Sequence, residues 1–310
     1  MINKIKLFFL IFLYLLINIS NSNSEIYIYA KVDDEIITNY DLEKESKYLK
    51  ILNPNLIQLE NNKILNLARK SLIKEIIKKK EIKKIKDLKK NNSFINKYLE
   101  TLYLKLDYKN EDEFVSDLKK KNIYTLSQIK EKIKIELLWN ELIFTKYKNQ
   151  IKIDKNKLAK KIKELDNKTQ KEYLISEIVF NKKRDQSLDA LLDQIKLSIK
   201  DIGFNNTANI YSISESSKLG GKVGWINENS LSKNIIKKLT TINEGEYSDI
   251  IRIGNNYLIL KIDQIKINTI NINKEQELEK LIKFETNKQL NQFSRIYFDK
   301  SKINYTINEK

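Results

Sequence analysis

The sequence predicts an α+β protein in which one small mixed domain interrupts a mostly helical chain. All six glycines lie between Gly203 and Gly254, and Pro54 is the only proline. Glycine is used where the backbone needs a positive φ angle or where two backbones approach closely. We therefore expect long helices on both sides of a single segment of tight turns, and we expect that segment to carry the distinctive fold.

The length and composition are sufficient for two modest domains. The chain has 310 residues, of which 41% are hydrophobic, and its net charge is +17. Such a charge would suit nucleic acid or an anionic membrane. The lysines, however, are spread along every predicted helix, and the densest basic stretch, 78–90, contains no aromatic residue. We therefore predict no nucleic-acid partner, whereas a weak contact with anionic lipid stays open.

The chain contains neither cysteine nor histidine. The lack of cysteine excludes disulfides, thiolate nucleophiles and cysteine-bound metals. The lack of histidine excludes the commonest general base and every catalytic triad that needs imidazole. We expect no metal site and no cofactor, and any enzymatic activity would have to proceed without imidazole.

The first 24 residues have the pattern of a cleaved signal peptide. Lys4 and Lys6 precede an unbroken apolar run at 7–17, and the small residues Ser22 and Ser24 follow. The alternative is a membrane anchor, but about eleven apolar residues are too few for a span of about twenty. We therefore predict cleavage after Ser24 and a mature protein that works outside the cytoplasm.

The segment 25–168 is predicted to form one strand followed by helices. Alternating apolar residues mark the strand at 25–32. Thr38 is placed to cap the first helix, which must end before Pro54 because the residue before proline disfavours the helical region. Asn110 with Glu113, and Thr125 with Gln128, have the spacing of capping boxes. Apolar periodicity then predicts these helices: 39–53, 56–85, 94–106, 111–121, 126–148 and 155–165.

The segment 171–266 is predicted to be a compact α+β domain. Its first strand, 173–180, precedes a helix that opens at Ser187 and ends at Gly203. A short helix at 232–239 follows the glycine-rich run, and strands at 248–253 and 257–265 form a hairpin around Gly254.

The last segment, 270–310, is predicted to contain an amphipathic helix at 274–298 and a strand at 303–307. Both elements are apolar enough to need a partner. The most economical partner is the N-terminal helical part, so we expect the two ends of the chain to meet.

Residues 171–266 resemble the parvulin, or PpiC-type rotamase, domain. The fold signature of the resemblance is the block that contains Gly220, Gly221, Gly224 and Trp225. Residues 32–42, 112–118 and 139–143 also look like the helical domain of SurA-type chaperones, although these matches are less specific. The runs that carry the parvulin likeness are SEIV at 176–179, YS at 211–212, GGKVGW at 220–225, EGEYS at 244–248 and YLILK at 257–261.

The parvulin resemblance implies prolyl cis/trans isomerisation without a cofactor, by two histidines, a Cys or Asp between them, and apolar residues that grip the proline. The first histidine position falls on Glu177, the Cys or Asp position on Ser214, and the second histidine position on Leu258. The substrate-contact positions fall on Leu231 and Ile235, with Tyr257 beside the second histidine position. The polar network is therefore lost while the apolar positions stay apolar.

The resemblance as a whole implies a periplasmic chaperone that binds unfolded or nascent outer-membrane protein segments. Its parvulin module would be catalytically weak or inactive. One alternative is an active peptidyl-prolyl isomerase that assists folding, and a second is a basic surface protein that binds anionic lipid. The sequence indicates neither the identity of the client nor the oligomeric state.

Overall fold

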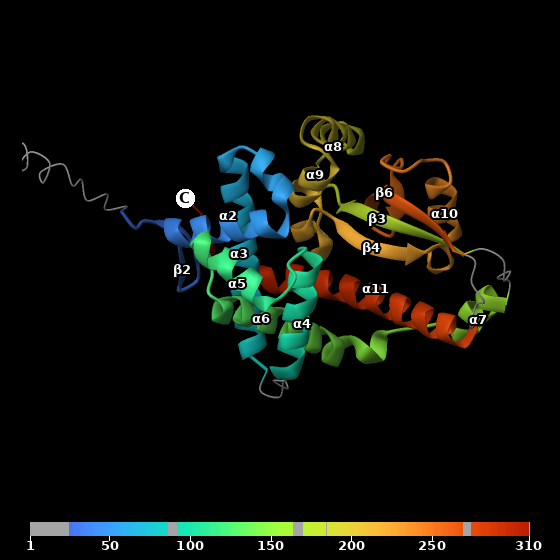
Figure 1. Cartoon of the computed structure of the whole chain (residues 1–310), viewed down its shortest axis with the longest axis horizontal. Coiled ribbons are helices and arrows are strands. Elements are labelled where there is room, and N and C mark those ends of the chain that lie inside the picture. The colour runs from blue at the N-terminus through green and yellow to red at the C-terminus, as the bar shows by residue number, and fades with distance from the viewer. Residues whose placement is uncertain (1–24, 86–91, 164–169, 184, 269–273, 310) are drawn as a thin grey trace, which may run out of the picture.

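A computed structural model describes residues 25–85, 92–163, 170–183, 185–268 and 274–309. The predicted signal peptide, 1–24, lies outside the described residues. The molecule has a helical part, built from both ends of the chain, and a smaller part with a four-stranded sheet inserted between them (Figure 1). The prediction of an α+β fold is confirmed.

The helical part begins with a β-hairpin and continues with helices that pack side by side. The hairpin strand β2, which the sequence did not predict, pairs antiparallel with β1. The elements in order are β1 (Ile28–Val32), β2 (Glu35–Thr38), α2 (Asn39–Leu52), η1 (Pro54–Gln58), α3 (Asn61–Lys83), α4 (Asn92–Lys105), α5 (Glu111–Lys120), α6 (Leu126–Tyr147), η2 (Lys148–Gln150) and α7 (Lys155–Lys163).

Two predictions for these helices need correction. The helix expected over 56–85 is divided, because Glu60 has an extended backbone and separates the 3-10 turn η1 from α3. The capping box expected at Asn110 is incomplete, since the carboxylate of Glu113 accepts from the N–H of Lys109 instead. The box at Thr125 is complete, and Thr38 caps α2 as predicted.

The C-terminal segment completes the helical part. Strand β7 (Ile307–Glu309) pairs antiparallel with β1, and helix α11 (Lys274–Lys302) lies along α6 and α7. The indole N–H of Trp139 in α6 donates to Ser294 Oγ in α11 at 2.8 Å. Helix α11 is longer than predicted, and the last strand begins at Ile307 rather than at residue 303.

The smaller part is an antiparallel sheet with strand order β4-β3-β6-β5. Helices α8 and α9 cover one face of it, and α10 covers the other. The predicted hairpin around Gly254 is confirmed, whereas β4 and α9 were not expected. The elements are β3 (Gln170–Phe180), α8 (Leu188–Ile202), α9 (Phe204–Tyr211), η3 (Glu215–Leu219), β4 (Lys222–Asn227), η4 (Glu228–Ser230), α10 (Lys233–Leu239), β5 (Ile251–Ile253) and β6 (Asn256–Asn268).

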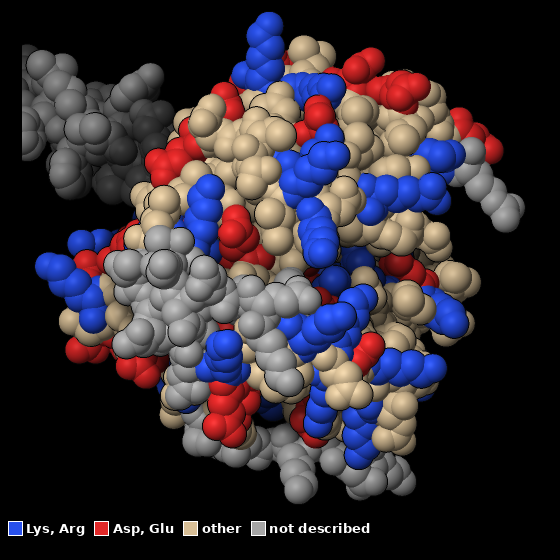
Figure 2. Space-filling model, turned by 90° about the vertical axis from the view of Figure 1, so that its right-hand side faces the viewer, with Lys and Arg blue, Asp and Glu red and all other residues tan. Residues whose placement is uncertain are grey.

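Positive and negative side chains are mixed on the face of the molecule that Figure 2 shows. Figure 2 shows lysine and arginine side chains interspersed with acidic and uncharged residues on one face of the molecule. Within the described residues, no helix is long and apolar enough to cross a bilayer.

Candidate functional site

The glycine pair at the start of β4 brings two backbones into close contact. Gly220 and Gly221 have φ angles of +68° and +79°. A Cβ atom on Gly221 would lie 2.3 Å from the carbonyl oxygen of Glu177. The N–H of Glu177 in turn donates to the carbonyl of Gly221 at 2.8 Å. The pair therefore holds the η3–β4 turn against β3, directly beside Glu177.

Gly224 and Trp225 have a different role from the glycine pair. Gly224 has a φ of +110° and faces open space, so conformation rather than crowding favours glycine there. Trp225 lies on the edge strand β4 with 37% of its surface exposed. The ammonium of Lys266 lies 4.1 Å from the centre of the indole ring, a distance typical of a cation–π contact.

Two of the predicted catalytic positions lie together in the structure. The carboxylate oxygen Oε1 of Glu177 accepts hydrogen bonds from Ser214 Oγ at 2.6 Å and from Ser216 Oγ at 2.9 Å. Ser216 was not predicted, although its place two residues after Ser214 in the same turn was a usable signal. The two serine hydroxyls also lie within hydrogen-bond distance of each other, at 2.5 Å, so their two protons are shared among the three oxygens. The hydroxyl protons of these three side chains are therefore used in bonds among themselves.

The third predicted position, Leu258, belongs to the core of the sheet. Leu258 pairs with Val179 across β6 and β3, and only 5% of its surface is exposed. Leu231 is equally buried at 4%, and Ile235 packs against the same cluster. These side chains fill the layer between the sheet and α10.

Tyr257 lies on the opposite face of the sheet, where its ring stacks on Phe180 with the ring centres 5.6 Å apart. Neighbouring residues of a strand point to opposite faces, so Tyr257 and Leu258 cannot contribute to one surface. The structure therefore separates Tyr257 from Leu231 and Ile235, with which it was predicted to bind substrate.

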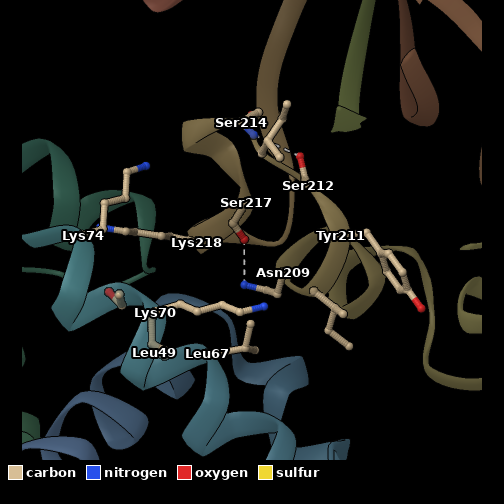
Figure 3. A pocket seen from close by; sticks show the side chains of 13 residues that line it. Leu49, Leu67, Lys70, Lys74, Asn209, Tyr211, Ser212, Ser214, Ser217 and Lys218 are labelled. Atoms are coloured by element: carbon tan, nitrogen blue, oxygen red, sulfur yellow. Dashed lines mark hydrogen bonds between the residues drawn. The ribbon is translucent and has the colours of Figure 1, made fainter. Parts of the chain in front are cut away.

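The cavities on the described part of the molecule include three with volumes of 270, 730 and 530 Å³. Leu231, Ile235 and Tyr257 line none of these three. Ser214 lines the cavity of 270 Å³, which lies between α3 and the α9–η3 segment (Figure 3). The figure shows lysines from α3 on one side of this cavity and serines from the other part of the chain opposite them.

Ion pairs join the two parts of the molecule next to this cavity. Lys74 Nζ lies 2.7 Å from Glu215, and Lys78 Nζ lies 2.5 Å from Glu136 and 3.7 Å from Glu215. Lys218 lies 3.5 Å from Glu136. Burial alone would raise the pKa of Glu215, but Lys74, Lys78 and Lys218 lower it well below its usual value. This cluster anchors η3 to α3 and α6, and no local sequence pattern indicated it.

Arg295 of α11 is a further residue that the sequence did not indicate. Burial lowers the pKa of its guanidinium below the usual value. The carboxylates of Glu177, Asp299 and Glu215 raise this pKa, but they do not offset the effect of burial. The C-terminal helix thus places a cation near the position where the parvulin resemblance expects the first histidine. Among the described residues, no cluster of three or more carboxylates is arranged to hold a metal ion.

Comparisons with known proteins agree with the fold of the inserted part. Residues 174–264 match the family model described as rotamase, PPIC-type PPIASE domain. A crystal structure of a PpiC-type peptidyl-prolyl cis-trans isomerase domain is 23% identical, covering 31% of this chain and 92% of that one with a TM-score of 0.28.

Two longer structures are also similar. PrsA from Bacillus subtilis is 19% identical over 90% of this chain and 91% of its own, with a TM-score of 0.29. A structure reported for two SurA-like chaperones, PEB4 and Cj1289 of Campylobacter jejuni, is 20% identical. The match covers 91% of this chain and 98% of that one, with a TM-score of 0.34. These identities and scores are too low to assign a function, and no curated protein matches the chain. The match to the family model and the antiparallel sheet with its covering helices together show that the inserted part is a PpiC-type parvulin domain within a mostly helical chain.

Proposed function

We propose that this protein is a SurA-type chaperone that holds extended segments of unfolded proteins, and that its parvulin domain has weak or no isomerase activity. The proposal of weak or no isomerase activity rests on the residues at the three catalytic positions. Glu177 and Ser214 are hydrogen-bonded to each other, and Leu258 is buried in the core.

Isomerisation of a prolyl bond must lower a barrier of about 20 kcal/mol by stabilising a twisted amide. That chemistry needs an apolar pocket for the proline ring and a polar group that can donate to the twisted bond. In this domain Leu231 is buried beneath α10 rather than open to a ligand, and the first histidine position holds a carboxylate, which accepts a hydrogen bond from Ser214. Both requirements are therefore poorly met.

The holding function is proposed for the helical part, residues 25–168 together with 270–310, and the parvulin domain is taken as 171–266. Exposed aromatic side chains support it. Phe94 and Tyr98 lie one turn apart on α4, and Phe94 exposes 60% of its surface. Exposed apolar surface of this kind can receive the alternating apolar side chains of an unfolded strand.

The proposed location is the periplasm, and the proposed clients are unfolded outer-membrane protein segments. The signal pattern at 1–24 supports export. Outer-membrane strands alternate apolar and polar residues and expose aromatic side chains before they insert. Such clients would match a chaperone whose exposed aromatic residues are separated by charged surface.

The test uses the chain from residue 25 in two assays. Light scattering follows the aggregation of a urea-unfolded porin on dilution, and a fluorogenic peptide follows cis-to-trans isomerisation of an X–Pro bond. We expect suppressed aggregation and an isomerisation rate equal to the uncatalysed one. Replacing both Phe94 and Tyr98 with serine should weaken suppression, whereas serine at the exposed Ile303 should not.

The alternative is an active isomerase, and the match to the PPIC-type family model favours it. It predicts a rate well above the uncatalysed one, and a loss of that rate when Leu231 and Ile235 are both replaced with alanine in a chain that still folds by circular dichroism. That result would overturn the proposal of an inactive site. Equal loss of suppression in the serine variants at Phe94, Tyr98 and Ile303 would overturn the proposed holding surface.

A further inference from the structure

Two of the three cavities lie side by side along the seam between α3 and the parvulin domain. The smaller has a volume of 270 Å³ and the larger one of 530 Å³. Both are lined by Leu67 and Lys70 from α3 and by Ile210 and Tyr211 from α9. Because they share these four residues, the two cavities adjoin each other, and we call them together the seam groove.

Basic residues outnumber acidic ones in the lining of the seam groove. Its lining contains a single acidic residue, Asp201. The basic residues of the lining are Lys63, Arg69, Lys70, Lys74 and Lys218.

Lys70 is the most informative of these basic residues because it lines both halves of the groove. The other four basic residues of the lining each have an acidic partner: Lys63 pairs with Glu60 at 3.9 Å, Arg69 with Glu309 at 3.1 Å, Lys74 with Glu215 at 2.7 Å and Lys218 with Glu136 at 3.5 Å. Lys70, in contrast, has an exposed side chain and makes no ion pair or hydrogen bond with the part of the chain that the structure describes. The groove therefore presents an uncompensated cation at its centre.

The groove also has apolar walls and hydrogen-bonding groups. Leu197 of α8 lines the larger half and leaves 59% of its surface exposed, which is unusual for a leucine in a cavity wall. Ser212 and Ser217 line the smaller half, opposite the lysines of α3 (Figure 3). Apolar walls with a few polar groups are typical of pockets that bind organic ligands.

We propose that the seam groove binds an extended peptide segment in which carboxylate side chains adjoin apolar ones. Charge complementarity selects a carboxylate, since Lys70, alone among the five basic residues of the lining, has no ion-pair partner among the described residues. The exposed Leu197 and the shared Leu67 and Tyr211 select apolar neighbours. The inference rests on the proposed function only in taking a polypeptide as the ligand, and it names a site distinct from the aromatic residues of α4.

The experiment measures direct binding by isothermal titration calorimetry with the chain from residue 25. The probe is a blocked ten-residue peptide in which glutamate alternates with leucine and tyrosine, and its neutral counterpart has glutamine in place of each glutamate. At low salt we expect the acidic peptide to bind about tenfold more tightly than the neutral one. The difference should shrink as the ionic strength rises, because salt screens exposed charges.

Substitutions then locate the site. Lys70→Glu should weaken binding of the acidic peptide about tenfold, and Leu197→Ser should weaken binding of both peptides. Both residues are exposed, so neither change should impair folding. The matched control is Lys79→Glu, which makes the same change of charge at an exposed position of α3 that lines neither half of the groove.

Four results would overturn the proposal. These are failure of the acidic peptide to bind, equal binding of the two peptides, equal weakening by the substitutions at Lys70 and Lys79, and displacement of the peptide by an equal concentration of inorganic phosphate or a ten-nucleotide single strand. The aggregation assay is separate, so suppression that survives Lys70→Glu would leave the proposed chaperone function intact while the groove is rejected.

Discussion

Gly221→Ala provides a sharp test of how the parvulin domain is held together. An alanine Cβ at this position would lie 2.3 Å from the carbonyl oxygen of Glu177 and 2.9 Å from the Cβ of Ala208. The first of these atoms belongs to the backbone of the central strand pair and cannot rotate away. The residue would also have to keep a φ of +79°, which side chains other than glycine rarely adopt.

The cost has two components. A left-handed conformation costs an alanine about 1–2 kcal/mol, and forcing an extra carbon into a packed site costs about 1–3 kcal/mol more. The matched control is Gly245→Ala, because Gly245 has a similar φ of +86° and nothing within 4 Å of its Cβ position. Only the conformational component should appear there, so Gly221→Ala should be the more destabilising by about 1–3 kcal/mol.

The assay is urea unfolding followed by far-ultraviolet circular dichroism and by tryptophan fluorescence, since Trp225 lies in β4 and Trp139 in α6. We expect a lower transition midpoint for Gly221→Ala than for Gly245→Ala, with the largest shift in the signal of Trp225. Equal midpoints for the two variants would refute the argument that the close approach to Glu177 requires glycine.

Three further predictions concern the helical part. Burial alone would raise the pKa of Glu45, but Lys132, 2.8 Å away, lowers it below its usual value of 4.5. The ionised Glu45 therefore stabilises the folded state fully above about pH 4.5, and this contribution is lost as the pH falls through the pKa of Glu45 in the folded protein. The melting temperature should drop on acidification, and it should drop less steeply in the Glu45→Gln variant. Ser294→Ala should cost about 1–3 kcal/mol in urea unfolding, because it leaves the buried indole N–H of Trp139 without an acceptor; an unchanged midpoint would contradict this. Thr125→Ala should lower the free energy of unfolding by about 1 kcal/mol, because it removes the N-cap of α6. Unchanged hydrogen-exchange rates at the start of α6 would contradict this prediction.

Local patterns in the sequence predicted most elements of the structure. Thr38 and Thr125 begin helices where their side chains can cap them, and Gly254 turns the hairpin of β5 and β6. These features depend on residues within a few positions of one another. The parvulin domain was predicted from the resemblance of the glycine-tryptophan block to that family. The close backbone approach at Gly221 is one physical reason for that block.

The candidate site was predicted only in part. The parvulin resemblance placed two of its catalytic positions on Glu177 and Ser214, and the structure joins these two side chains by a hydrogen bond. The sequence did not reveal that Tyr257 faces away from Leu231, because the register of β6 against β3 decides which face each side chain occupies. It did not reveal the ion pairs of Lys78 either, since their partners lie on other helices.

The sequence by itself determined the class of the protein: an α+β chain with one glycine-marked domain, a predicted export signal, and no imidazole or thiol for catalysis. These conclusions depend on residue identity and short spacing, which the chain displays directly. Only the tertiary structure decided that the carboxylate of Glu177 is occupied by two serine hydroxyls and that Leu258 is buried. It also decided that α3 and α9 enclose a basic groove around Lys70. Such surfaces are assembled from residues far apart in the chain, and their positions depend on the packing of the whole molecule.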